Sequence, residues 1–176
     1  FTHQLRQVSF YDGQQQYEKA ESILRDAIRT EPDNEKRWLS LAEYLGKRRG
    51  IEQGETVLQQ ARKELPNNGK LWLALGGLYE STKRVERARE LYREMETAFS
   101  GKPEASEAQV KLAVLDWAEG KVEEAEQKVQ AVLKDNSRSS DALMLRGKIA
   151  LQRGNGKDAI LDFRSVLKDQ PELVEG

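Results

Sequence analysis

Residues 69–102 read GKLWLALGGLYESTKRVERARELYREMETAFSGK and contain two amphipathic helical patterns in succession. In each pattern, apolar or small residues recur at positions i, i+3, i+4 and i+7, which lie on one face of an α-helix. The two sets are Trp72, Leu75, Gly76 and Tyr79, followed by Ala88, Leu91, Tyr92 and Met95. A short polar segment, residues 81–83, separates them. The stretch therefore predicts a helical hairpin of 34 residues.

The hairpin pattern repeats along the chain. Trp38 precedes Trp72 by 34 residues, and Ala125 precedes Ala159 by the same interval. A fixed period of this length is the signature of repeat proteins, in which stacked units share one continuous core. The pattern predicts a single all-α domain over residues 1–176, built from five repeats. Their predicted bounds are 1–34, 35–68, 69–102, 106–139 and 140–173, with residues 103–105 as an insertion.

The composition is that of a helical protein laced with ion pairs. Charged residues make up 34% of the 176 residues, hydrophobic residues make up 38%, and the formal net charge is only −1. A balanced charge gives no electrostatic footprint for nucleic acid, and no apolar run approaches the roughly 20 residues of a membrane span. Without cysteine, neither a disulfide nor a thiolate metal site can form. The composition does not distinguish the cytoplasm from a bacterial periplasm, so the compartment stays open.

The first helix of the fourth repeat departs from the pattern. Pro103 suits its first position, since proline lacks the N–H that a helix start leaves unbonded, and we expect the insertion to lengthen this helix by about a turn. Residues 110–118 are apolar almost all round, and Asp116 takes the slot that Tyr79 holds in the third repeat. A surface helix should have one apolar face, and this one has two. We expect the second face, with Trp117, to be covered by a partner or by a flanking helix outside this sequence.

The two ends of the sequence suggest a part of a longer protein. The chain begins with Phe1 rather than methionine, and we recognise no signal sequence. Ile160, Phe163 and Leu167 belong to the last predicted helix pair, and residues 173–174 are expected to begin a further first helix. Repeat arrays normally end in a polar cap, so we expect the chain to associate end to end at high concentration.

Catalytic and cofactor motifs are missing from the sequence. His3 is the sole histidine and lies near a terminus, so a metal site or a nucleophile–base pair lacks its parts. The glycine-rich run at residues 154–157 falls on a turn inside a repeat, and the acidic run at 123–126 begins a helix, where negative charge favours the dipole. We therefore predict that the protein is not an enzyme, has no cofactor and acts by binding.

The repeated positions resemble those of the tetratricopeptide repeat family. That pattern has Trp, Leu and a small residue in the first helix, then Ala, an aromatic residue and Pro in the second. Matching residues of the first helices are Trp38, Trp72, Leu41, Leu75, Leu112, Gly76 and Gly147. Matching residues of the second helices are Ala20, Ala88, Ala125, Ala159, Tyr92, Phe163, Pro32, Pro66 and Pro171. The departures are Gln4, Gln109, Asp116, Arg146 and Ser137. The resemblance implies a right-handed superhelical solenoid of five hairpins, with the first helices on its concave face.

The resemblance also implies a partner-binding groove along the first helices. At the fifth position of each repeat the residues are Leu5, Leu39, Leu73, Val110 and Met144, an unbroken aliphatic series. The predicted groove is lined by Lys36, Leu39, Glu43, Lys70, Leu73, Val110, Val114, Trp117, Met144 and Leu151. It suits an apolar peptide or an amphipathic helix. The alternative is that the fifth position only packs between neighbouring first helices. A groove predicts that Leu73→Glu or Val110→Glu removes partner binding without unfolding the protein.

Several functions remain open at this level. Some members of the family clamp a C-terminal carboxylate with a set of lysine, arginine and asparagine residues. This set is absent, which disfavours a role as an adaptor for chaperone tails. Residues 71–80 and 86–96 also resemble half-a-tetratricopeptide repeats, which scaffold RNA-processing complexes, although the balanced charge argues against RNA. Residues 145–171 resemble long bacterial members linked to envelope assembly and exopolysaccharide export. We expect a protein–protein interaction scaffold of bacterial origin, with a purely structural oligomerisation module as a further alternative.

Overall fold

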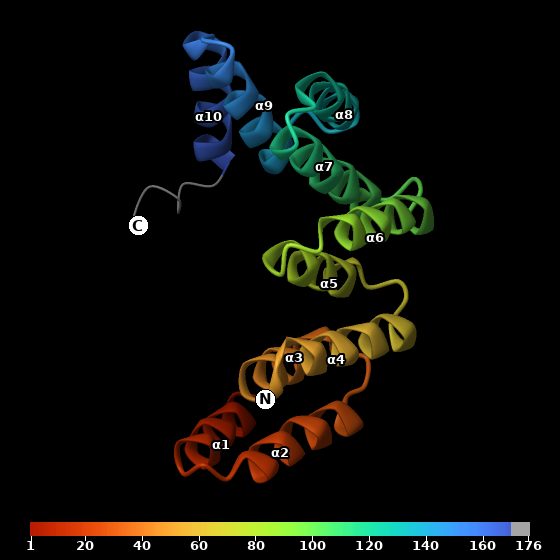
Figure 1. Ribbon diagram of the computed structural model, residues 1–176, viewed down its shortest axis with the longest axis vertical. Helices are drawn as coiled ribbons and strands as arrows, with labels where there is room; N and C mark the ends of the chain where they lie inside the picture. Colours follow the sequence, from red (N-terminus) through yellow and green to blue (C-terminus); the bar gives the residue numbers. More distant parts are fainter. Residues whose placement is uncertain (170–176) are drawn as a thin grey trace. The chain divides into compact units, whose positions relative to one another are not determined.

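The structure is a computed structural model that describes residues 1–169, and in this range the chain forms ten α-helices and no strand (Figure 1). The helices are α1 (Thr2–Gly13), α2 (Tyr17–Thr30), α3 (Glu35–Arg49), α4 (Ile51–Glu64), α5 (Gly69–Ser81), α6 (Val85–Ala98), α7 (Pro103–Ala118), α8 (Val122–Asp135), α9 (Ser140–Gln152) and α10 (Gly156–Asp169). The prediction of an all-α chain of short paired helices is confirmed. The expected helix start at residues 173–174 and the proline at position 171 lie outside the described residues.

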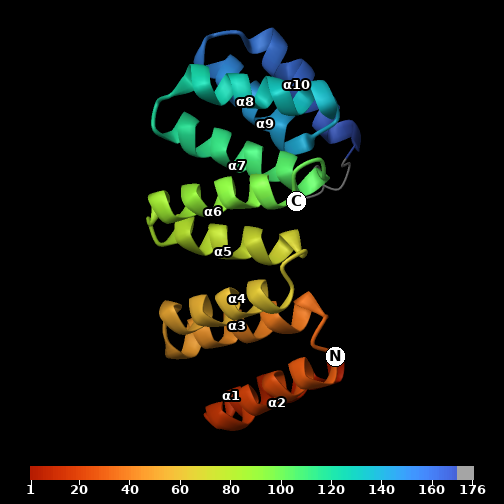
Figure 2. The same ribbon diagram turned by 90° about the vertical axis from the view of Figure 1, so that its right-hand side faces the viewer.

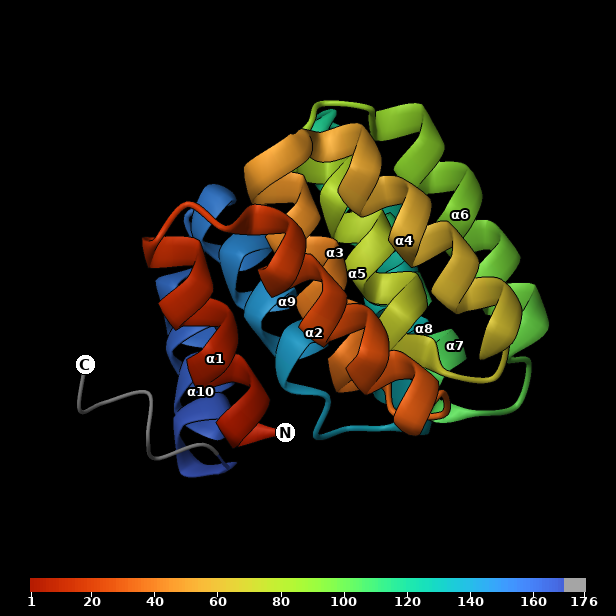
Figure 3. The same ribbon diagram turned by 90° about the horizontal axis from the view of Figure 1, so that it is seen from below.

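The chain divides into two compact units, Phe1–Ala88 and Arg89–Gly176, so that α6 begins in the first unit and continues in the second. In the first unit α1 packs on α2, α2 on α3, α3 on α4 and α4 on α5, and α3 also contacts α5. Figures 2 and 3 show α3 and α4 running alongside each other. In the second unit α7 packs on α8, α8 on α9 and α9 on α10, and α7 also contacts α9. Each unit thus alternates contacts inside a hairpin with contacts between successive hairpins.

Local sequence signals explain where the helices begin and end. The side chain of Asn34 accepts a hydrogen bond from the backbone N–H of Lys36 and caps α3. Pro103 occupies the first turn of α7, which at 16 residues is the longest described helix, as the insertion predicts. The turns within the hairpins use positive φ angles, of 79° at Gly120 and 76° at Gly154, a conformation that glycine adopts without steric cost. The turn therefore has the same backbone geometry in both hairpins of the second unit.

The second apolar face of α7 is covered by the chain itself. Val110 and Ala113 of α7 belong to one buried cluster with residues of α8, α9 and α10, and Val114 and Trp117 pack against its edge. The remaining members of the cluster are Ala125, Val129, Val132, Leu133, Ala142, Leu143, Leu145, Ile149 and Val166. Helices of the chain itself, α8 and α9, therefore cover most of this face, which corrects the expectation that its cover lies outside the sequence. A partner contact at the half-buried Trp117 stays a prediction.

Candidate functional site

A cavity of about 460 Å³ lies between α3, α4 and α5 in the first unit. It is open to solvent, and its wall is almost entirely aliphatic or bare backbone. We refer to it as the α3–α5 pocket. Its lining residues are Leu39, Ala42, Glu43, Gly46, Ile51, Gly54, Leu58, Ala74, Gly77, Leu78 and Ser81. Three helices therefore converge on one concave apolar surface, which is the usual form of a ligand site.

Two glycines of the pocket have opposite surroundings. A Cβ added to Gly54 would lie 2.7 Å from the carbonyl oxygen of Ala42 and 3.2 Å from the Cα of Gly46. The helices α3 and α4 can approach closely here because Gly46 and Gly54 have no side chains. A Cβ added to Gly77 would meet no atom within 4 Å. Gly54 is thus required by packing, whereas Gly77 leaves a stretch of α5 backbone uncovered at the pocket wall.

Glu43 is the one charged residue that lines the pocket. Its side chain is exposed, and its carboxylate makes no hydrogen bond or ion pair with any residue that the structure describes. The other polar side chain in the lining, Ser81, already donates its hydroxyl to the carbonyl oxygen of Leu78 at 3.0 Å. The pocket therefore presents an apolar wall with one uncompensated negative charge.

The other predicted groove residues of the first unit lie outside the pocket. Lys36 is exposed, and Lys70 is exposed with its Nζ 3.1 Å from Oε1 of Glu35, a hydrogen bond that lowers the pKa of that carboxyl. Leu73 is half-buried and does not line the cavity. Of the predicted set, the structure brings together Leu39 and Glu43 in this pocket.

In the second unit the predicted aliphatic series is interrupted. Val110 is only 4% exposed and belongs to the core, so it cannot contact a partner, and Val110→Glu would place an unpaired charge in that core. Val114 is half-buried at the edge of the cluster. Met144 and Leu151 are exposed, at 37% and 53%, and remain candidates for contact. The expectation that Val110 tests the groove without unfolding the protein is corrected by its burial.

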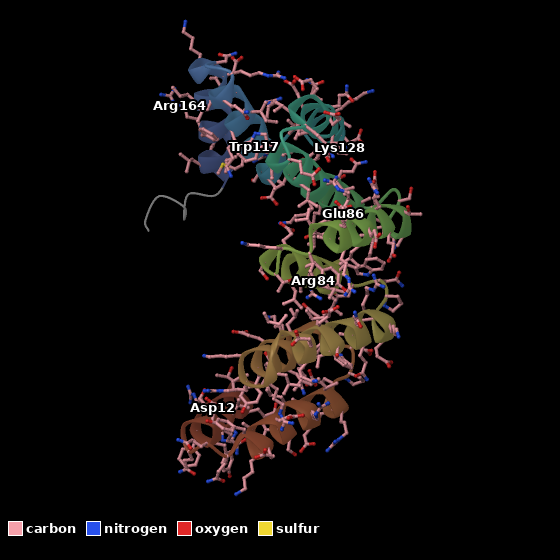
Figure 4. The ribbon with its side chains drawn as sticks, viewed as in Figure 1. Asp12, Arg84, Glu86, Trp117, Lys128 and Arg164 are labelled. Carbon is pink, nitrogen blue, oxygen red and sulfur yellow. The ribbon has the colours of Figure 1, made fainter. Side chains whose placement is uncertain are left out.

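Trp117 joins α7 to α9 rather than standing free. Its indole Nε1 donates to Oε1 of Gln152 at 2.7 Å, and Nζ of Lys148 lies 5.9 Å from the ring centroid. Figure 4 labels Trp117. Both contacts hold the ring against the neighbouring helix. The side chain is half-buried, so part of the ring stays accessible beside Leu151 of the same predicted groove.

A set of ion pairs that the sequence analysis missed connects successive hairpins. The twenty-first position of each of the first four predicted repeats is charged, and its side chain pairs with the next first helix or with the turn that follows it. The pairs are Glu21 with Arg49 at 2.8 Å, Glu55 with Arg84 at 2.5 Å, Arg89 with Asp116 at 2.6 Å and Glu126 with Arg153 at 2.6 Å. A charge recurring at one repeat position is the signal that could have revealed them.

Asp116 is the most buried acid of this set, at 4% exposure. Burial alone would raise the pKa of Asp116, but hydrogen bonds from Lys128 at 2.7 Å and Arg89 at 2.6 Å outweigh it and hold the pKa below its ordinary 3.8. Figure 4 labels Lys128 on α8. The departure from the family pattern at Asp116 is thus explained, because the acid binds two cations from α6 and α8.

Paired helices stacked through small residues, with an apolar pocket and no group of residues that could hold a metal ion within the described range, define a helical-repeat protein. The chain belongs to the tetratricopeptide repeat family. Models of this repeat match residues 39–103 and 110–173, and a second model of the repeat matches residues 5–34. The predicted family and the predicted helical-repeat solenoid are confirmed. None of the described helices is both long enough and apolar enough to span a bilayer.

Solved structures share this fold at low sequence identity. MamA is 12% identical, covering 96% of this chain and 97% of its own, with a TM-score of 0.58. PilW, described as a type IV pilus biogenesis factor, is 17% identical over 95% and 76%, with a TM-score of 0.61. YrrB, described as having an unusual peptide-binding site, is 16% identical over 93% and 83%, with a TM-score of 0.53. A search of curated proteins gives no match. At these identities the likeness concerns the fold.

Proposed function

We propose that the protein is an interaction scaffold that binds a peptide or a helix of another protein, and that the α3–α5 pocket anchors this segment. The observation that carries the proposal is the pocket itself, which is open, mostly apolar and about 460 Å³ in volume. Pockets of roughly 300–1,000 Å³ commonly hold ligands in proteins. The peptide-binding site named for YrrB supports a peptide as the ligand class, and the pilus role named for PilW supports a partner in a bacterial surface-assembly system.

The size of the expected effect follows from the apolar lining. Full burial of one Leu, Phe or Met side chain contributes about 1.5–3 kcal/mol, which corresponds to roughly a 10- to 150-fold change in affinity. One anchor of this kind cannot supply a micromolar affinity alone. In the second unit, the exposed side chains of Met144 and Leu151 are candidates for a separate contact with a partner.

The experiment uses Gly77 to close the pocket without disturbing the fold. Gly77→Leu places an aliphatic side chain in open space, and Gly77→Ala adds only a methyl group at the same site. A phage library of 12-residue peptides is selected on the wild type, and the affinities of the recovered peptides are measured for all three proteins. We expect Gly77→Leu to weaken binding at least tenfold and Gly77→Ala to change it by less than about threefold. Equal affinities for the wild type and Gly77→Leu would disprove the role of the pocket.

A further inference from the structure

The polar groups of the α3–α5 pocket identify the chemistry of its ligand. Glu43 carries the pocket's sole charge, and its carboxylate has no partner among the described residues. Ser81 is engaged by its own helix through the carbonyl oxygen of Leu78. A ligand that enters this pocket therefore meets one group that can still form an ion pair, and that group is an acceptor with negative charge.

Cations near the end of α3 do not compensate this charge. Arg48 binds Asp12, and Arg49 lies 2.8 Å from Glu21, so both are directed toward α1 and α2. Lys47 follows Glu43 by four residues but forms no ion pair with it in the described part of the chain. The cation that complements Glu43 must therefore come from the ligand.

We propose that the pocket selects a segment of another protein that carries one bulky apolar side chain and a Lys or Arg within four positions of it. The apolar side chain fills the space beside Gly77, and the cation pairs with Glu43. The spacing follows from the geometry, because Glu43 itself lines the pocket, and side chains within one helical turn or two strand residues lie on the same face. This inference rests on the proposed function and specifies its ligand.

The expected selectivity is modest because Glu43 is exposed. An exposed ion pair changes affinity by up to about fivefold, and a like-charge pair opposes binding by a similar factor. Replacement of the peptide's Lys or Arg by Glu should therefore weaken binding to the wild type by roughly 2- to 25-fold. Glu43→Lys should bind the Glu peptide more tightly than the peptide with Lys or Arg, which reverses the wild-type order of affinities. Glu43→Gln should bind the two peptides with nearly equal affinity.

The test selects 12-residue phage peptides on the wild-type protein after depletion on Gly77→Leu. The recovered peptides are synthesised with the native cation or with Glu in its place, and their dissociation constants are measured by fluorescence anisotropy. Glu64→Lys serves as the matched charge reversal, because Glu64 is exposed on α4 and does not line the pocket. Circular dichroism establishes that each variant is folded.

Three results are distinguishable. Peptides enriched in an apolar residue next to Lys or Arg, whose charge preference reverses in Glu43→Lys but not in Glu64→Lys, support the inference. The inference is overturned, and the proposed function stands, if the pocket-dependent peptides lack this cation. The same holds if their charge preference is the same in Glu43→Lys and in Glu64→Lys. A library with no peptide that separates the wild type from Gly77→Leu overturns both.

Discussion

The glycines of the α3–α5 pocket allow one substitution to be compared at two sites with opposite surroundings. We predict that Gly77→Ala stabilises the protein and that Gly54→Ala does not. Both residues lie within helices, α5 and α4, so each alanine gains the same helix propensity of about 1 kcal/mol. That gain cancels when the two variants are compared with each other, and the difference between them reports packing alone.

The magnitude of this difference follows from the contacts of the added methyl group. At Gly77 it meets nothing within 4 Å, so the full gain of about 1 kcal/mol should appear. At Gly54 it would lie 2.7 Å from a backbone oxygen, whereas carbon and carbonyl oxygen normally approach to about 3.3 Å. Because the obstacle is backbone of α3, the helices must separate, and overpacking of this kind costs about 1–3 kcal/mol. Gly77→Ala should therefore be more stable than Gly54→Ala by about 1–3 kcal/mol.

Urea denaturation followed by circular dichroism measures this difference. The slope of the transition should be the same in both variants, which shows that the surface exposed on unfolding is unchanged. If Gly54→Ala is as stable as Gly77→Ala within about 0.5 kcal/mol, which is the usual scatter for surface substitutions, then α3 and α4 do not approach as the structure shows. The argument for an open pocket beside Gly77 would lose its basis at the same time.

Three further predictions concern buried and charged residues. Asp116→Asn should destabilise the protein by about 3–5 kcal/mol in urea denaturation at neutral pH, because it leaves the Arg89 and Lys128 cations without their carboxylate. Since folding lowers the pKa of Asp116, its stabilisation is complete above about 3.8 and is lost as the pH falls below that value. The stability difference between the wild type and Asp116→Asn should therefore narrow between pH 5 and pH 2, and a constant difference would contradict this. Val110→Glu should unfold the second unit, whereas Leu73→Glu, at a half-buried site, should leave a folded protein by circular dichroism.

The fold could be predicted because the hydrophobic pattern of each hairpin lies within its own 34 residues. The spacing of Trp72, Leu75 and Ala88 follows from the helical period and needs no knowledge of distant contacts. Repetition at 34 residues then supplies the stacking, since one hairpin cannot bury its apolar faces alone. For the same reason, the sequence predicts where the repeats lie better than it predicts the role of any single surface residue.

The candidate site could be predicted only in part. Position in the repeat placed Leu39 and Glu43 near a binding surface, but Val110, at the same position as Leu39, is buried by α9. Whether a fifth-position side chain is covered depends on how closely the next first helix approaches, and one helix's sequence does not determine that distance. The pocket could not be predicted for the same reason. Gly54 and Gly77 are the same residue type in the sequence, and only the structure shows that backbone packs against Gly54 and that nothing packs against Gly77.

The ion pairs between hairpins lead to a last prediction, which compares the junction at Glu55 with the junction at Arg89. Three junctions place an acid at the twenty-first repeat position, and the junction at Arg89 has the reverse polarity. At the neighbouring junction, Glu55 accepts from Tyr79 at 3.1 Å and from Arg84 at 2.5 Å. Tyr79 and Asp116 occupy the same slot of their repeats, so at these two junctions the residue in that slot is matched to the charge at the twenty-first position. At the other two junctions the slot holds Leu45 and Ala150, which carry no polar side chain.

Reversal of the Arg89 junction tests whether this matching determines which charge the junction tolerates. Arg89→Glu alone brings a third carboxylate to Asp116 and Glu119, and should cost about 3–5 kcal/mol. Asp116→Tyr and Lys121→Arg, added together, give this junction the residue types of Tyr79 and Arg84, which are the partners of Glu55 at the equivalent repeat positions, and should recover most of that loss. The stabilities of the single and triple variants are compared by urea denaturation. If the triple variant is no more stable than Arg89→Glu, the two junctions are not equivalent, and the charge at this position depends on its wider surroundings rather than on its pair.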